Sequence, residues 1–391
     1  MPTILSRAAL KFRIFPIPAL ILAIAALAIA PPGEARSRNK RSRPFRSALL
    51  IEAETGQVLK SIRPRLRVIP ASIVKMMTIL LTLERVQEKS ISMNDIVVTS
   101  RKAARIGGQQ VYLKQGERFR LKELLKAVAI NSANDAAYAI AEHVTGDADI
   151  FVEMMNDRAR ELGMADTRYV NVHGLPPNRG QPPNLMSARD AGILAQALLK
   201  FPIVTQWGKI KRAPFRGGKF ILTNTNRLVG RFRGIDGIKT GSYRKAGYSI
   251  VATAKRGDLR LIAIILSSGH PRRRFQEAKR LLSWGFAKFR WYQSKASVSG
   301  RALTVKIQSG QKDRIRLTSM GNFRKLVHRG EVRNISVRRE IPSFLAAPVQ
   351  KGQQVGRLVF ELRGKEMGEL RLAAGESVDR LGFFQTLIRL R

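Results

Sequence analysis

Three short groups of residues in this chain carry side chains suited to acyl transfer. The first is Ser72-Ile73-Val74-Lys75, in which a hydroxyl and an amine are three residues apart. Because residues three apart share one face of a helix, Lys75 is predicted to reach the Ser72 hydroxyl. A hydroxyl becomes a good nucleophile only when a base takes its proton, and burial near other cations lowers the pKa of an amine enough for that task. Ser72 and Lys75 are therefore the candidate nucleophile and base.

The same Ser-x-x-Lys spacing also begins at Ser37 and at Ser309, so the surrounding residues must decide between the three. Only Ser72 follows a nearby proline and opens a strongly apolar helical pattern, over residues 73–84. The free N–H groups at the start of a helix favour negative charge. We therefore expect the backbone amide of Ser72 to face the oxyanion that develops during acyl transfer.

The second group is Ser132-Ala133-Asn134. It interrupts an apolar helical pattern that runs from residue 121 to residue 143, as small polar side chains do when they line a cleft. We expect Ser132 to relay protons between Lys75 and a leaving amine, and Asn134 to hold a peptide group of the substrate. The alternative is a polar junction between two helices.

The third group is Lys239-Thr240-Gly241, in a strand pattern predicted for the edge of a sheet. Lys239 adds positive charge, Thr240 can bind a carboxylate, and Gly241 permits a close approach of backbone. The alternative is that the triplet is incidental.

The elements that must position these groups form one α/β (α+β) domain over residues 47–292. The apolar spacing predicts a hairpin at 48–60, helices at 149–162, 187–200 and 274–290, and strands at 235–242, 247–255 and 259–267. The strands indicate an antiparallel sheet, packed with a helical lobe. Residues 293–299 form a small-residue linker, and alternating apolar residues over 300–375 predict a small all-β domain.

The two ends of the chain carry targeting signals. Basic residues before an apolar run indicate a secretory signal peptide over residues 1–35, with cleavage after Ala35; the alternative is an uncleaved membrane anchor. Residues 36–46 form a basic linker whose charge opposes translocation. Residues 376–391 end in a short amphipathic segment, which is either a membrane-surface helix or a helix docked on its own domain.

Composition restricts the partners. Lysine and arginine total 71 against 28 acidic residues, a net charge of +43, so an anionic partner is expected. Nucleic acid is not expected, because aromatic residues are only 7% of the chain and no nucleic-acid recognition motif is present. Anionic lipid headgroups and acidic envelope polymers are the expected surfaces. Cysteine is absent and the four histidines are scattered, which argues against a zinc peptidase; we expect no metal or other cofactor.

In this order, the three groups resemble those of β-lactamases and penicillin-binding proteins. The surrounding sequence, over most of residues 47–375, resembles the low-molecular-mass penicillin-binding proteins that are D-alanyl-D-alanine carboxypeptidases. Residues 347–352 are similar to the C-terminal module of the same family. Val74 stands where the family usually has threonine, and Glu52 where it usually has aspartate; neither change removes a catalytic group.

The resemblance implies a β-lactamase/DD-peptidase-like fold and an exported serine enzyme. Such an enzyme removes the terminal D-alanine from peptidoglycan stem pentapeptides through an acyl-Ser72 intermediate, and β-lactams acylate it. The roles carried over are Ser72 as nucleophile, Lys75 as base, Ser132 as proton relay and Asn134 as a contact to the substrate amide. The implied location is periplasmic or extracytoplasmic, at the outer face of the cytoplasmic membrane.

The resemblance also implies the residues that hold the substrate's end. Lys239 and Thr240 bind the terminal carboxylate beside Gly241, and the amide of Ser242 completes the oxyanion site. Arg274 is either a further partner of the carboxylate or one of three consecutive exposed arginines.

Three other functions remain as alternatives: a DD-endopeptidase, a β-lactamase and a non-catalytic envelope-binding protein. One major class of β-lactamases deacylates with a glutamate base, and no Glu-x-x-Leu-Asn segment lies between Asn134 and Lys239. We therefore expect slow deacylation, so that a penicillin adduct on Ser72 persists for minutes or longer.

Overall fold

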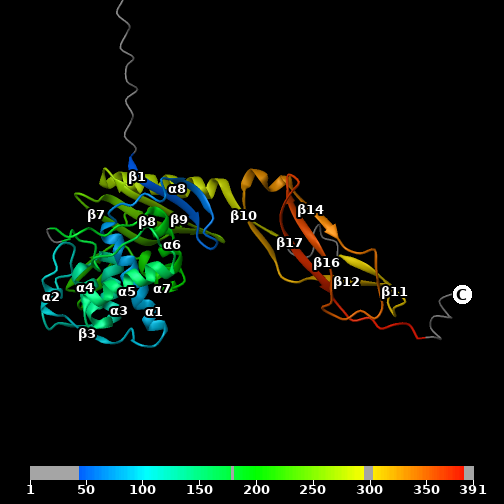
Figure 1. Cartoon of the computed structure of the whole chain (residues 1–391), viewed down its shortest axis with the longest axis horizontal. Helices are drawn as coiled ribbons and strands as arrows, with labels where there is room; N and C mark the ends of the chain where they lie inside the picture. The colour runs from blue at the N-terminus through cyan, green and yellow to red at the C-terminus, as the bar shows by residue number, and fades with distance from the viewer. Residues whose placement is uncertain (1–43, 178–179, 295–302, 383–391) are drawn as a thin grey trace, which may run out of the picture. The chain divides into compact units, whose positions relative to one another are not determined.

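The computed structural model describes residues 44–177, 180–294 and 303–382 (Figure 1). The predicted signal peptide, residues 36–43 of the predicted basic linker and the last nine residues of the predicted tail lie outside this part of the chain, as do residues 295–299 of the linker. Across these three ranges, no helix is long and apolar enough to cross a membrane.

A five-stranded antiparallel sheet forms the centre of the first domain (Figure 1). Its order is β2 (Val58–Ile62), β1 (Phe45–Glu52), β9 (Leu259–Ser268), β8 (Gly247–Arg256) and β7 (Ile235–Tyr243). The predicted hairpin and the three predicted strands are present, and β7, which carries the Lys-Thr-Gly triplet, is an edge strand as expected.

Both faces of this sheet are buried. Ile262 and Ile264 of β9 pack with the helical lobe, whereas Leu261 and Ala263 of the same strand pack on the other face with α8 (Pro271–Lys288). Successive side chains of a strand point to opposite faces, so a strand buried on both sides needs an unbroken apolar run. The run Leu261–Leu266 supplies one, and it fixes the sheet between two layers of helix.

The helical lobe covers one face of the sheet (Figure 1). Its longer helices are α1 (Lys75–Gln87), α3 (Leu121–Asn131), α4 (Asn134–Thr145), α5 (Ala148–Glu161) and α6 (Ala188–Leu199). The long helical pattern predicted over residues 121–143 is two helices, because the chain breaks at Ser132, which has a left-handed backbone (φ 65°).

Several short elements of the lobe were not predicted. They are the helices α2 (Arg101–Ala104) and α7 (Pro202–Gly208) and two ribbons, β3 (Ile96–Val98) with β4 (Arg118–Arg120) and β5 (Arg212–Phe215) with β6 (Phe220–Thr223). Phe119 of β4 stacks on Phe215 of β5, with ring centroids 5.0 Å apart, and joins the two ribbons. These elements have three to seven residues, fewer than the window in which a helical or strand period can be recognised, so sequence patterning does not reveal them.

The departure at Glu52 has a structural role. Its carboxylate is buried at the end of β1 and accepts hydrogen bonds from the backbone N–H groups of Glu54 and Thr55, at 2.9 and 2.7 Å, and from the Thr55 hydroxyl at 2.8 Å. A carboxylate there satisfies the donors of the β1–β2 turn. Glu52 therefore stabilises the hairpin.

The second domain is all-β, as predicted. Its six-stranded sheet has the order β14 (Ile335–Glu340), β16 (Gln354–Leu362), β17 (Lys365–Ala374), β12 (Arg314–Ser319), β11 (Thr304–Gln308) and β15 (Phe344–Ala346), and β10 (Phe289–Ser294) pairs with β13 (Phe323–His328). Val378 is buried in the core of this domain and bridges to Val349, and Arg380 bridges to Gly310. The domain therefore continues past the predicted boundary at residue 375, into the segment that we predicted as a tail.

Candidate active site

Ser72 lies in a short 3-10 helix, η1 (Ala71–Val74), and the α-helix α1 begins only at Lys75. The prediction that Ser72 opens an α-helix is corrected in this respect. Side chains three apart eclipse one another in a 3-10 helix. The Nζ of Lys75 donates to the Oγ of Ser72 at 3.0 Å, so the contact that the spacing predicts is present.

Lys75 is fully buried and is held in place by a second hydrogen bond. Its Nζ donates to the backbone carbonyl of His173 at 2.6 Å. Burial first, and then the positive charge of Lys239, hold the pKa of Lys75 well below its usual value, although Asp135 opposes the shift. A neutral amine at hydrogen-bond distance from a hydroxyl is suited to take its proton.

Ser132 and Lys239 meet although they are far apart in the chain. The Nζ of Lys239 donates to the Oγ of Ser132 at 2.7 Å and to the Thr240 carbonyl at 3.1 Å. Burial and the nearby charge of Arg274 lower the pKa of Lys239 to about 7. The break between α3 and α4 therefore places the Ser132 hydroxyl against the Lys239 amine, whose positive charge in turn acts on Lys75.

Asn134 begins α4 and faces the segment before it. Its Nδ2 donates to the Gly107 carbonyl at 2.8 Å, which fixes the orientation of the side-chain amide. Its Oδ1 is buried and has no hydrogen-bond partner among the described residues. An acceptor left unpaired in a buried position costs free energy unless a ligand satisfies it. Asn134 is therefore able to accept a hydrogen bond from a substrate N–H group.

Two glycines let backbone pack directly on the Ser72 turn. A Cβ on Gly241 of β7 would lie 2.5 Å from the Pro70 carbonyl oxygen and 2.9 Å from the Ser72 nitrogen. A Cβ on Gly174, whose φ is +79°, would lie 2.1 Å from the Ala71 carbonyl oxygen. No other residue has room at either position, so Gly241 is required for the edge strand to approach the Ser72 turn this closely.

Thr240 and Ser242 flank this close approach. The Thr240 hydroxyl is buried and donates to the Oγ1 of Thr225 at 2.8 Å, while Ser242 is exposed and pairs with Tyr248 of β8. The next residue along β7 from Gly241, Ser242, thus lies at the open edge of the sheet beside the Ser72 turn.

Arg274 is buried, unlike its neighbours Arg272 and Arg273, which are exposed. The alternative in which Arg274 belongs to a run of exposed arginines is therefore wrong. Its Nη1 donates to the carbonyls of Gly241 and Ser249, at 3.1 and 3.2 Å. Burial, and then the charge of a nearby arginine, lower its pKa to about 10, so it stays protonated at neutral pH next to the Lys-Thr-Gly strand.

Sequence reasoning gave no role to the loop around His173, which supplies the carbonyl that fixes Lys75. Burial and then Lys75 lower the pKa of His173 to about 3, and its Nδ1 accepts a hydrogen bond from the Leu175 N–H at 3.1 Å. His173 therefore contributes its backbone carbonyl, and not its imidazole, to the contact with Lys75. The available signal was the resemblance of residues 171–175 to the family.

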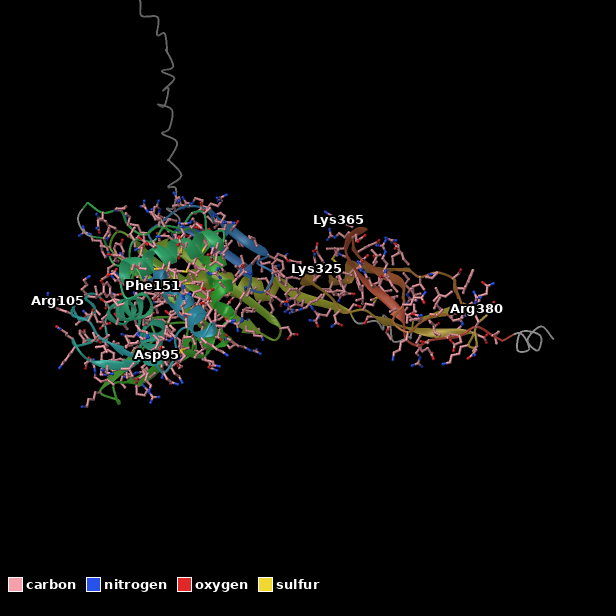
Figure 2. The ribbon with its side chains drawn as sticks, turned by 60° about the horizontal axis from the view of Figure 1, so that its bottom comes forward. Asp95, Arg105, Phe151, Lys325, Lys365 and Arg380 are labelled. Carbon is pink, nitrogen blue, oxygen red and sulfur yellow. The ribbon has the colours of Figure 1, made fainter. Side chains whose placement is uncertain are left out.

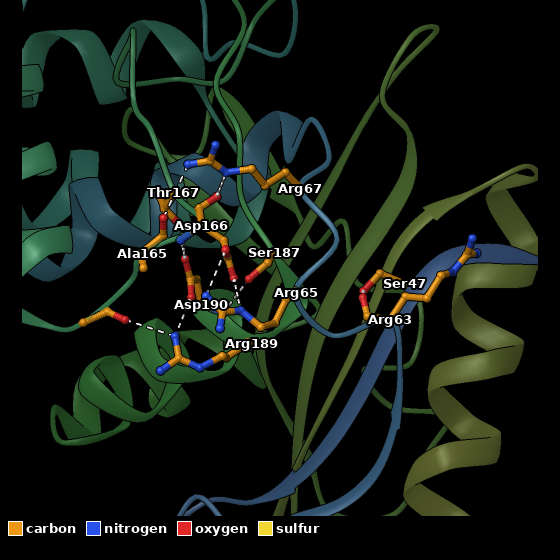
Figure 3. Close-up of polar contacts among 11 residues, drawn as sticks. Ser47, Arg63, Arg65, Arg67, Ala165, Asp166, Thr167, Ser187, Arg189 and Asp190 are labelled. Atoms are coloured by element: carbon orange, nitrogen blue, oxygen red, sulfur yellow. Dashed lines mark hydrogen bonds and ion pairs between the residues drawn. The ribbon is translucent and has the colours of Figure 1, made fainter.

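A buried carboxylate anchors the chain that leads into this loop (Figure 3). Asp190 at the start of α6 accepts from the Asp166 N–H and from the Thr167 hydroxyl, each at 2.8 Å, and from Arg189 at 3.2 Å. Its own N–H donates to the Ser187 Oγ at 3.2 Å. These bonds tie residues 165–168 to α6 and so fix the entry of the loop that contacts Lys75.

Comparison with known proteins gives the same result as the geometry. The family described as D-alanyl-D-alanine carboxypeptidase matches residues 36–269, and the one described as penicillin-binding protein 5, C-terminal domain, matches residues 286–380. The D-alanyl-D-alanine carboxypeptidase DacF of Bacillus subtilis is 36% identical over 382 residues, which are 95% of this chain and 96% of that protein.

Solved structures agree. Penicillin-binding protein 5 of Haemophilus influenzae superposes with a TM-score of 0.66 at 28% identity, over 86% of this chain and 98% of that one. Penicillin-binding protein D2 of Listeria monocytogenes, in its ampicillin-bound form, superposes with a TM-score of 0.57 at 29% identity, over 62% of this chain and 97% of that one.

The fold and the site together define a serine hydrolase of the penicillin-binding class. The chain belongs to the D-alanyl-D-alanine carboxypeptidase family, and the predicted family is confirmed. The β-lactamase and non-catalytic interpretations give way to this assignment.

Proposed function

We propose that this enzyme removes the terminal D-alanine from peptidoglycan stem pentapeptides through an acyl-Ser72 intermediate. The observation that carries the proposal is the 3.0 Å hydrogen bond from Lys75 to Ser72, at a position where burial lowers the pKa of the amine. A neutral Lys75 accepts the Ser72 proton as the Oγ attacks the carbonyl carbon of the penultimate D-alanine.

Collapse of the tetrahedral intermediate breaks the C–N bond and leaves an ester on Ser72. The leaving amine takes a proton, which Ser132 passes on from Lys75, and D-alanine departs. Water then hydrolyses the ester and restores the hydroxyl. The backbone N–H groups of Ser72 and Ser242 hold the oxyanion in both halves of the reaction.

The substrate's end is held by cations on and beside β7. Lys239 in its protonated form, the Thr240 hydroxyl and the buried Arg274 bind the terminal carboxylate, and the unpaired Oδ1 of Asn134 accepts from the peptide N–H. A carboxypeptidase needs such a site because its substrates all end in a free carboxylate. The Gly241 close approach brings this site to the nucleophile.

β-Lactams acylate the same serine in this proposal, and the existence of an ampicillin-bound form of the Listeria relative supports it. Because no Glu-x-x-Leu-Asn segment lies between Asn134 and Lys239, we expect the adduct to be hydrolysed slowly.

The enzyme acts outside the cytoplasm in this proposal, after export by residues 1–35. Residues 36–391 carry 68 basic and 27 acidic residues, a net charge of +41, which attracts the enzyme to anionic lipids and cell-wall polymers. Sedimentation with purified cell wall should therefore decrease as salt rises, because salt screens exposed charges.

The test is D-alanine release from a stem pentapeptide ending in D-alanyl-D-alanine. Ser72→Ala should lower kcat by at least about 10³-fold. Ser309→Ala is the matched control, because Ser309 begins another Ser-x-x-Lys sequence but is exposed in the β domain. Release that survives in Ser72→Ala would contradict the proposal, and release only from cross-linked stems would make the enzyme an endopeptidase.

A further inference from the structure

A pocket of about 260 Å³ in the helical lobe is lined by four basic side chains and by no carboxylate. The four are Lys211, Arg212, Arg227 and Arg231. Basic residues outnumber acidic ones in this chain, so many of them must be unpaired. These four line one hollow, where like charges repel unless an anion enters.

None of the four side chains has an acidic partner in the part of the chain that the structure describes. Elsewhere in the lobe arginines pair with acids, as Arg158 does with Glu84 at 2.7 Å and Arg216 with Glu117 at 2.7 Å. The pocket cations are exposed and carry no such ion pair. The pocket therefore has room and charge for an external anion.

The pocket lies beside the proposed carboxylate site. The Thr240 hydroxyl bonds to Thr225, and the residues on either side of Thr225, Asn224 and Asn226, line the pocket. Arg227 of the pocket is close enough to Arg274 for its charge to lower the pKa of Arg274. One short segment thus separates the pocket from the site that holds the terminal carboxylate.

The wall shared by the two sites is fixed. The Nδ2 of Asn224 donates to the carbonyls of Gly208 and Ile210, at 3.1 and 2.8 Å, and the Nδ2 of Asn226 donates to the Gly237 carbonyl at 3.1 Å. A wall held by such bonds is preformed, so little ordering is needed when a ligand binds.

We infer that this pocket binds a second carboxylate, carried by the leaving group, so that the enzyme favours substrates whose leaving residue or leaving stem peptide is acidic. The inference rests on the proposed function, because it takes the terminal carboxylate to be bound by Lys239, Thr240 and Arg274. The side chain of the leaving residue starts from the same Cα as that carboxylate. In this proposal, a carboxylate at the end of that side chain reaches the pocket cations past residues 224–226.

The test compares two acylated tripeptides, one ending in D-Ala-D-Glu and one in D-Ala-D-Gln, which differ by one charge. Wild-type enzyme at low salt should show a kcat/KM about fivefold higher for the glutamate peptide, the size expected of an exposed ion pair. The ratio should decrease as salt rises. In the double variant Lys211→Gln/Arg231→Gln it should fall to about one.

The control variant Arg339→Gln/Lys365→Gln removes two exposed cations from the β domain and should keep the wild-type ratio. A ratio of one in the wild type, with D-Ala-D-Ala still hydrolysed, overturns the inference and leaves the proposed function intact. A ratio that persists in the pocket variant also overturns it. If no peptide is hydrolysed at all, the proposed function fails and the inference fails with it.

Discussion

The interior of the active site and the surface of the β domain use cations in opposite ways. Lys75 and Lys239 are buried, no carboxylate hydrogen-bonds to either within the described residues, and the pKa of each is lowered, mainly by burial. In the β domain, Arg338 and Arg357 are exposed, both pair with Glu340, and hydrogen bonds to glutamates raise the pKa of both arginines.

The difference follows from solvent. A cation kept from water and from acidic partners is costly to fold but readily gives up or accepts a proton, which is what acyl transfer needs. A cation on the surface keeps its charge and its hydration, so pairing changes little. Lys365 and Arg380 are further exposed basic side chains of the β domain (Figure 2).

The largest expected effect follows from removing Lys75, the proposed base. Lys75→Met keeps an unbranched side chain of similar length but removes the amine that bonds to Ser72. Because the hydroxyl then has no base, the rate of D-alanine release should fall by about 10³-fold or more. Lys312→Met, in the exposed Ser309 sequence, is the matched control, and an equal loss in both variants would contradict the assignment.

The second effect is on the pH dependence of kcat/KM. In the proposed site Lys239 binds the carboxylate when it is protonated, and its pKa is about 7, so kcat/KM should fall roughly tenfold per pH unit above that value. On the acidic side kcat/KM should fall as Lys75 becomes protonated. A peptide ending in D-alaninamide has no terminal carboxylate, and its slower hydrolysis should show no fall near pH 7. The same fall for both peptides would contradict this role of Lys239.

The third effect is on stability and has the opposite sign to the effect on activity. The pKa of Lys239 is about 7 in the folded protein and 10.5 in the unfolded chain, so protonation favours unfolding. This destabilisation is complete below about pH 7 and decreases as the pH rises toward 10.5. Lys239→Met should therefore raise the free energy of unfolding at pH 6 by ~2 kcal/mol, after the loss of the bond to Ser132, while activity is lost. Denaturation by urea at pH 6 and pH 10 measures this. A variant that is less stable at pH 6 would show that the burial cost is small.

The smallest effect is expected in the β domain. Arg357→Gln breaks exposed ion pairs to Glu340 and Glu369. Because exposed pairs contribute little, the melting temperature should change by less than about 1 °C, with activity unchanged. A change in melting temperature as large as the change that Lys239→Met causes would contradict the contrast between buried cations of the site and exposed cations of the β domain.

Much of the site follows from sequence because its side chains lie in short motifs. The Ser72 to Lys75 spacing predicts a contact that is present, and the polar stretch at 131–135 predicts a break between two helices. The edge strand with Gly241 also follows from its pattern. In each case the signal is local, carried by residues within a few positions of one another.

Other features depend on contacts that no local pattern encodes. The His173 carbonyl that holds Lys75 is 98 residues away in the chain, and a backbone carbonyl has no residue type to identify it. The hydroxyl of Thr225 and the burial of Arg274 likewise depend on how distant segments pack. The 3-10 geometry at Ser72 was missed because its residues would equally suit an α-helix.

The central claim is that Ser72, activated by Lys75, forms the acyl-enzyme. Intact mass measurement after brief exposure to penicillin, followed by peptide mapping, tests it most directly. We predict one adduct per chain that maps to Ser72, persists for minutes or longer, remains in Ser309→Ala and is absent from Ser72→Ala and Lys75→Met. An adduct that maps elsewhere, or one that still forms in Ser72→Ala, would contradict the account.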